Sequence, residues 1–111
     1  MQVKEINLEN GMPTCDEALC ELKSSLNSAK QSKYKCLLVI HGYGSSGKGG
    51  AIRLKARQWL NAQLKNGKVK AVINGEDFNI FNFKALELKN KYKDLEQLLK
   101  VTNHGVTVVE L

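Results

Sequence analysis

Two patterns of apolar residues take turns along this chain. One is typical of strands and the other is typical of helices. Short apolar segments predict strands at residues 3–8, 36–40, 69–73 and 106–111. Apolar residues at helical spacing predict helices at about residues 15–30, 51–65 and 84–100. The predicted order is therefore β-α-β-α-β-(α)-β, and strands that alternate with helices favour parallel pairing in a layered α/β sheet.

Local signals support these boundaries. Thr14 and Glu17 have the spacing of a capping box, in which each residue bonds the backbone of the other at a helix start. Asn66-Gly67 is a typical helix end. The continuous apolar run at residues 36–40 is typical of a strand that is buried on both faces. One shared core is expected to contain Leu38, Ile40, Ile52, Leu60, Val72 and Val108.

Length and composition place the chain among ordinary globular proteins. At 111 residues, 42% of them hydrophobic, it predicts a single domain over residues 1–111 and excludes a disordered or disulfide-stapled chain. No apolar run approaches the roughly 20 residues that span a bilayer, and no signal-peptide pattern opens the chain. We therefore expect a cytoplasmic protein without a membrane partner. The three cysteines lack metal-binding spacing, so structural thiols are expected, with no metal and no cofactor.

Positive charge is concentrated in the middle of the chain. The net charge is +6, yet residues 1–35 are neutral and residues 76–111 carry −1. Residues 36–75 contain no acidic residue and carry +7. A basic block of this kind suggests an anionic partner, although lysines that cluster only for solubility would give the same count.

A glycine-rich loop lies inside this block, between the buried strand and the second helix. Five glycines within nine positions let backbone N–H groups approach a ligand closely, and the following helix start adds partial positive charge. Phosphate is the natural ligand for such a site. The residues expected to hold it are His41, Gly42, Tyr43, Gly44, Ser45, Ser46, Gly47, Lys48, Gly49, Gly50, Arg53 and Arg57.

The loop permits more than one interpretation. Gly42, Gly47 and Lys48 fit the spacing of a nucleotide-binding P-loop, but Gly49 stands where that motif needs a Ser or Thr for Mg²⁺. A glycine connector without a ligand is a second interpretation. In the third interpretation, the loop binds the phosphate backbone of a nucleic acid, and Tyr43 would stack on an unpaired base.

The sequence resembles the Smr (small MutS-related) domain family, and it is most similar to small stand-alone bacterial members. The resemblance is carried by His41-Gly42-Tyr43-Gly44, which matches a His-Gly-x-Gly motif, and by the helix from Ile52-Arg53 to Trp59-Leu60. The last strand, residues 105–111, and the helix opened by Glu17-Ala18-Leu19 also fit. The extra helix at about residues 84–100 precedes the final strand.

The resemblance implies a fold and a function. The fold would be an α+β two-layer sandwich like the C-terminal domain of translation initiation factor three, with two helices on a mixed four-stranded sheet and an antiparallel last strand. The function would be binding of DNA or RNA, in DNA repair or recombination or in RNA and ribosome quality control. Some members also nick DNA or cleave RNA.

The sequence departs from the cleaving members at the end of its first strand. Those members carry Leu-Asp-Leu-His-Gly there, whereas Asn7 replaces the aspartate and Glu9 or Asn10 replaces the histidine. Asn cannot act as a general base, so an active endonuclease would need Glu9 and His41 as substitute catalytic residues. His41 at a strand end could equally hold the loop by bonding its backbone.

A third class of function is a protein–protein module. The segment 78–83 contains Phe78, Phe81 and Phe83, which would give a partner protein an aromatic anchor. The lysines of the extra helix are balanced by neighbouring acids, so that helix is expected to be a solvated face.

Overall fold

The structure is a computed structural model that describes residues 2–9, 14–42, 48–78, 81–93, 95 and 105–111. Its elements are β1 (Val3–Asn7), α1 (Cys15–Gln31), β2 (Cys36–Ile40), α2 (Lys48–Lys65), β3 (Ala71–Asn74), the 3-10 turn η1 (Gly75–Asp77), α3 (Phe83–Lys91) and β4 (Val106–Glu110). Within these ranges, no helix is long and apolar enough to cross a membrane.

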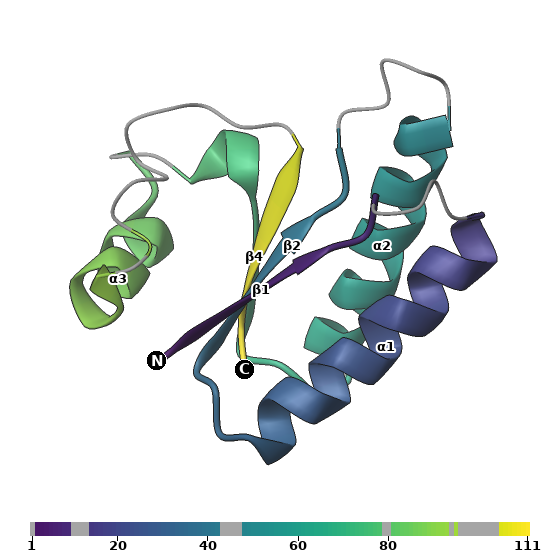
Figure 1. Cartoon of the computed structure of the whole chain (residues 1–111). Helices are drawn as coiled ribbons and strands as arrows, with labels where there is room; N and C mark the ends of the chain where they lie inside the picture. The colour runs from purple at the N-terminus through teal and green to yellow at the C-terminus, as the bar shows by residue number, and fades with distance from the viewer. Residues whose placement is uncertain (1, 10–13, 43–47, 79–80, 94, 96–104) are drawn as a thin grey trace.

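The four strands form one mixed sheet in the order β1-β2-β4-β3. β1 and β2 are parallel, and β4 runs antiparallel to both β2 and β3, as the family resemblance implies. Ile40 pairs with both Asn7 and Val106, so β1 and β2 end where β4 begins. We call this end of the sheet the loop end, because the glycine-rich segment leaves β2 there (Figure 1).

Local sequence explains how α1 begins. The predicted capping box is present: the backbone N–H of Glu17 donates to Thr14 Oγ1 at 3.2 Å, and that of Thr14 donates to Glu17 Oε1 at 2.9 Å. These bonds satisfy amides that the first helical turn would otherwise leave unpaired. The backbone N–H of Thr14 and the side chain of Glu17 are therefore bonded to each other, and this pairing fixes where α1 starts.

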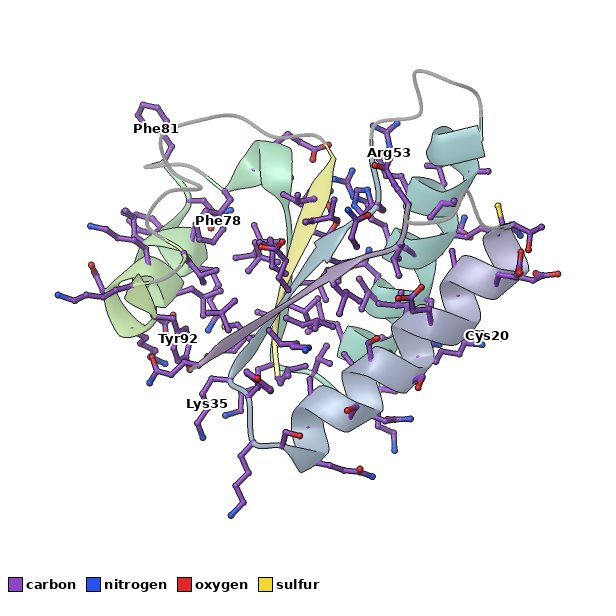
Figure 2. The ribbon with its side chains drawn as sticks, viewed as in Figure 1. Cys20, Lys35, Arg53, Phe78, Phe81 and Tyr92 are labelled. Atoms are coloured by element: carbon purple, nitrogen blue, oxygen red, sulfur yellow. The ribbon has the colours of Figure 1, made fainter. Side chains whose placement is uncertain are left out.

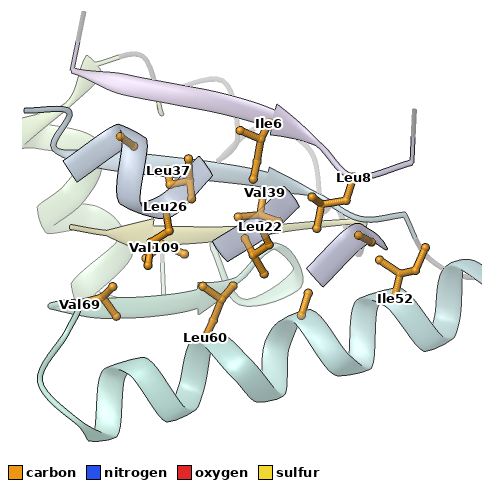
Figure 3. Packing of buried hydrophobic residues seen from close by; sticks show 13 residues of the cluster. Ile6, Leu8, Leu22, Leu26, Leu37, Val39, Ile52, Leu60, Val69 and Val109 are labelled. Carbon is orange, nitrogen blue, oxygen red and sulfur yellow. The ribbon is translucent and has the colours of Figure 1, made fainter. Parts of the chain in front are cut away.

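α1 and α2 lie side by side on one face of the sheet and form the main core (Figures 1 and 3). The helices contribute Leu22, Leu26 and Leu60, which pack with sheet residues such as Leu37 and Val39. This is the predicted layer of two helices on a mixed sheet. Gly67, at φ +74°, follows the end of α2 and confirms the sequence signal for that end, since the left-handed conformation favours glycine.

The opposite face of the sheet has its own core. There, α3 packs through Ala85 and Leu88 against Cys36, Ile73 and Val108. Phe78, Leu95 and the partly buried Leu38 belong to the same cluster. The expectation of one shared core was therefore wrong: Leu38 and Val108 face α3, whereas Ile52 and Leu60 face α1. Alternate side chains of a strand point to opposite faces, and here helices cover both faces.

The extra helix is present but shorter than predicted. α3 ends at Lys91, and Tyr92 adopts an extended conformation with φ −127° and ψ 93°. Tyr92 and Leu95 then pack on the sheet, so their apolar spacing reflects burial without a continuous helix. Most of the remaining predicted range, residues 94 and 96–100, lies outside the described residues. Two lysines of α3 have acidic partners, with Lys84 and Lys91 contacting Glu87 and the buried Glu110.

Candidate functional site

The candidate site lies at the loop end, where β1 and β2 finish next to each other. Gly42 follows β2 and has φ +77°, a left-handed conformation that glycine adopts without strain. A Cβ on Gly42 would lie 1.6 Å from Glu9 Oε1, so the carboxylate of Glu9 is packed against the glycine. Both the backbone conformation and this close approach explain why a glycine follows His41.

Part of the predicted loop falls outside the described residues. Tyr43, Gly44, Ser45, Ser46 and Gly47 all lie there. The backbone of Lys48, Gly49 and Gly50 forms the first turn of α2, which contains no acidic residue. The first amides of α2 are therefore at the loop end, and the partial positive charge of a helix N-terminus is not offset by a carboxylate in that turn.

His41 is fully buried and both of its ring nitrogens are hydrogen-bonded. Nδ1 lies 3.0 Å from the carbonyl oxygen of Gly42, and Nε2 lies 2.8 Å from Thr107 Oγ1. A carbonyl only accepts, so Nδ1 carries the hydrogen and neutral Nε2 accepts from the threonine hydroxyl. Burial is the main cause that lowers the pKa of His41 to about 4, and the charges of Arg57 and Arg53 lower it further. His41 is therefore neutral at pH 7 and links the start of the loop to β4.

Arg57 extends the same network into the protein. Its Nε donates to Thr107 Oγ1 at 3.0 Å, and its guanidinium forms a two-bond ion pair with Glu76, at 3.0 Å and 2.6 Å. The Arg57 side chain is only 13% exposed. We therefore assign Arg57 to the internal network, which runs from Glu76 through Arg57 and Thr107 to His41.

Sequence reasoning missed two members of this network. Glu76 is the first acid after Glu21, and that position was the available signal. Thr107 is a polar residue within an apolar strand, and its burial with a bonded hydroxyl gives it a specific role. The η1 turn brings Glu76 to Arg57, which no spacing rule anticipates.

Arg53 lies one turn closer to the loop than Arg57 and has a different environment. It lies on α2 at the loop end (Figure 2), and its positive charge helps to lower the pKa of His41. Its Nε is buried and, among the described residues, makes no hydrogen bond. A buried donor without a partner is costly, so this N–H is suited to donate to a ligand oxygen.

The basic block divides in space. Lys48, Arg53 and Lys55 belong to the half of α2 nearest the loop, whereas Lys65, Lys68 and Lys70 lie toward the other end of the sheet. A helix rises 1.5 Å per residue, so about 18 Å separates the backbone of Arg53 from that of Lys65. One run in the sequence therefore supplies two separate basic regions.

Glu9 and His41 are brought to neighbouring strand ends, as the sequence suggested. The Glu9 carboxylate lies against Gly42, while the ring nitrogens of His41 bond Gly42 and Thr107. Asn7 Oδ1 accepts the backbone N–H of Glu9 at 2.9 Å, so Asn7 shapes the turn after β1. In this arrangement His41 has no free nitrogen for proton transfer. No group of three or more metal-ligating side chains occurs among the described residues.

The neutral state of His41 predicts an acid-sensitive fold. An unfolded histidine has a pKa near 6.5, and folding lowers the pKa of His41 to about 4. The unfolded chain therefore binds more protons between these values, and stability is lost as pH falls. We expect this residue to cost about 2 kcal/mol of unfolding free energy between pH 7 and pH 5, measured by urea denaturation. A His41→Gln variant should have a flatter profile, and an NMR titration that places the His41 pKa above 6 would contradict the prediction.

Comparisons with known proteins agree with the fold described above. The family model of the Smr domain matches residues 10–77. The crystal structure of the Smr domain of Thermus thermophilus MutS2 superposes with a TM-score of 0.61 at 25% sequence identity, over 97% of this chain and 96% of that chain. No curated protein sequence matched the chain.

Proposed function

Because this chain belongs to the Smr domain family, we propose that it binds the phosphate backbone of a nucleic acid at the loop end of its sheet. Smr domains generally bind nucleic acids. The proposal for this chain assigns the contact to the start of α2, to Arg53 and to the glycine-rich segment that precedes them.

The observation that carries the proposal is the unsatisfied Nε of Arg53. This buried donor makes no hydrogen bond within the described part of the chain, although the residue is partly exposed. A guanidinium with a free N–H at a helix start is well matched to a phosphate oxygen, because both the side chain and the helix amides favour negative charge. A phosphate oxygen would give this N–H the acceptor that it lacks among the described residues.

The internal network supports the proposal by holding Gly42, the residue from which the glycine-rich segment continues. His41 donates to the carbonyl of Gly42, the Thr107 hydroxyl bonds the other nitrogen of His41, and Arg57 donates to Thr107. These bonds set the direction in which the backbone leaves β2, so the loop amides start from a fixed point. A pre-positioned backbone loses less entropy when an anion binds.

Cleavage is not part of the proposal. Asn7 replaces the aspartate of the cleaving members, and both nitrogens of His41 are occupied. Glu9 remains as a carboxylate beside Gly42, and no hydrogen bond links its carboxylate to His41 in the part of the chain that the structure describes. The chemistry that these residues support is anion binding.

The test is fluorescence anisotropy with a labelled single strand and a labelled duplex, each of DNA and RNA, at several salt concentrations. Arg53→Ala should weaken binding without changing sequence preference, because a phosphate contact carries no base information. Losing one such contact should flatten the log–log dependence of affinity on salt by roughly 0.7–0.9. Arg53→Lys keeps the charge but removes Nε, so it should recover only part of the affinity.

Lys65→Ala is the matched control. It removes the same charge from the same helix but at the end away from the loop, so it should leave the salt slope nearly unchanged. Equal losses for Arg53→Ala and Lys65→Ala would mean that α2 attracts nucleic acid only through its overall charge. Unchanged binding in Arg53→Ala would overturn the proposed site.

The cytoplasm is the location that this proposal implies. Polynucleotides are available there, and its reducing conditions suit the three free cysteines, Cys15, Cys20 and Cys36. Cys36 is buried in the core beneath α3, as expected for a structural thiol, and burial raises its pKa to about 12.

A further inference from the structure

The outer edge of β3 is an open edge of the sheet. In the strand order β1-β2-β4-β3, β3 pairs with β4 on one side, and no described strand pairs with its other side. An edge strand presents backbone N–H and C=O groups that can pair with another strand. This edge is on the side of the sheet opposite β1, and its groove is lined by none of the residues to which the nucleic-acid contact is assigned.

A groove of about 800 Å³ follows this edge. All four residues of β3 line it, together with Leu64 of α2 on one wall and Phe81 on the other. Phe81 is 87% exposed and Leu64 is 37% exposed, so both walls present apolar surface to solvent. Figure 2 shows Phe81 pointing away from the ribbon. The groove therefore combines an unpaired strand with flanking apolar side chains.

Charge is arranged asymmetrically along the groove. Lys70 lies at the start of β3 and Asp77 lies beyond its end, and both are exposed and line the groove. Lys68 adds a second positive charge at the basic end. Two further charged residues are already paired within the chain: Glu76, next to Asp77, with Arg57, and Lys84, which also lines the groove, with Glu87 and Glu110. The edge thus has one positive end and one negative end.

From this asymmetry we infer that the β3 edge binds the β3 edge of a second copy of this chain. Antiparallel pairing about a two-fold axis brings the basic end of each strand beside the acidic end of the other, and it does so twice. Parallel pairing would instead place lysine beside lysine. A two-fold interface uses the same patch on both copies, so the patch must be self-complementary, and this one is. The product is one continuous sheet of eight strands.

The proposed interface is small, so we expect the dimer to be weak. β3 has only four residues, so few backbone bonds form, and exposed ion pairs contribute little each. Small interfaces are typical of weak association. We therefore expect a dimer with a dissociation constant in the micromolar to millimolar range that weakens as salt is added.

The test is sedimentation equilibrium of the whole chain without nucleic acid. The wild type should form dimers as concentration rises. Lys70→Glu and Asp77→Lys each turn two attractive contacts per dimer into repulsive ones, so each should weaken dimerisation by about tenfold or more. The double variant Lys70→Glu/Asp77→Lys should dimerise like the wild type, because its charges are exchanged but still complementary.

Mixing the two single variants gives the sharpest result. Their charges are complementary to each other, so the equimolar mixture should form heterodimers at concentrations where each variant alone is mostly monomeric. Recovery in the mixture also demonstrates that both variants are folded. Lys93→Glu, which makes the same charge change outside the groove, should dimerise like the wild type.

Two results would overturn the inference. A wild type that remains monomeric to about 1 mM would mean that the edge is unpaired in this chain or takes a segment of a different protein. Dimers that are insensitive to Lys70→Glu and Asp77→Lys would place the interface elsewhere. Neither result bears on the loop-end site, because the experiment contains no nucleic acid.

Discussion

Replacing Leu60 with alanine is expected to lower the free energy of unfolding by about 2–5 kcal/mol. Leu60 is fully buried in the core that α1 and α2 form on the sheet. Alanine would lose the transfer free energy of the removed atoms and would leave a cavity, because the neighbouring helices and sheet are fixed by many other contacts. Urea denaturation at neutral pH measures the change.

Leu54→Ala is the control on the same helix. Leu54 is 59% exposed, so alanine removes little buried surface and should change stability only slightly. Equal losses at the two positions would contradict the orientation of α2 on the sheet. Leu38→Ala is expected to cost less than Leu60→Ala, since Leu38 is only partly buried and faces α3.

Glu76→Ala is expected to cost about 3 kcal/mol of unfolding free energy, because it would leave the nearly buried guanidinium of Arg57 without its carboxylate. The Arg57 side chain is 13% exposed and also supports Thr107 through its Nε. Glu76→Gln keeps a hydrogen-bond acceptor but not the charge, so its loss should be intermediate. Thermal and urea unfolding of both variants measure the effect.

Glu87→Ala is the matched control for this ion pair. Glu87 also contacts basic side chains, Lys84 and Lys91, but its own side chain is 47% exposed. Water screens such pairs, so the variant should unfold like the wild type within experimental error. If Glu76→Ala behaved in the same way, the Arg57–Glu76 pair would have no part in holding the loop end together.

Much of the fold could be predicted because its signals are local. The capping box at Thr14 and Glu17 fixes the start of α1, and Gly67 marks the end of α2. Which elements pack on each face of the sheet was harder to predict, because an apolar run such as residues 36–40 does not reveal what covers each side. The end of α3 was missed for a related reason: Leu95 is buried and Tyr92 is partly buried, at helical spacing from Leu88, without being in one helix.

The candidate site was predictable in place but not in detail. Strand, glycine loop and helix occur in the expected order, so His41, Gly42 and Arg53 lie at one end of the sheet. Arg57 was grouped with the phosphate-binding residues because charge counting considers neighbours in sequence only. Its partner Glu76 is nineteen residues away and is brought near by η1, whereas Thr107 comes from the last strand. Such long-range bonds depend on the tertiary fold, which residue spacing does not describe.

The two ends of the chain meet at the end of the sheet opposite the loop end. The backbone N–H of Lys35 donates to the carbonyl of Gln2, and the carbonyl of Lys35 accepts from Leu111, both at 2.8 Å. Both termini therefore leave the protein on the same side, close together (Figure 1). A purification tag, a surface tether or a fused domain at either terminus will extend away from the glycine loop. A pair of dyes on the two termini will transfer energy efficiently only while the chain is folded, so it reports unfolding without touching the site.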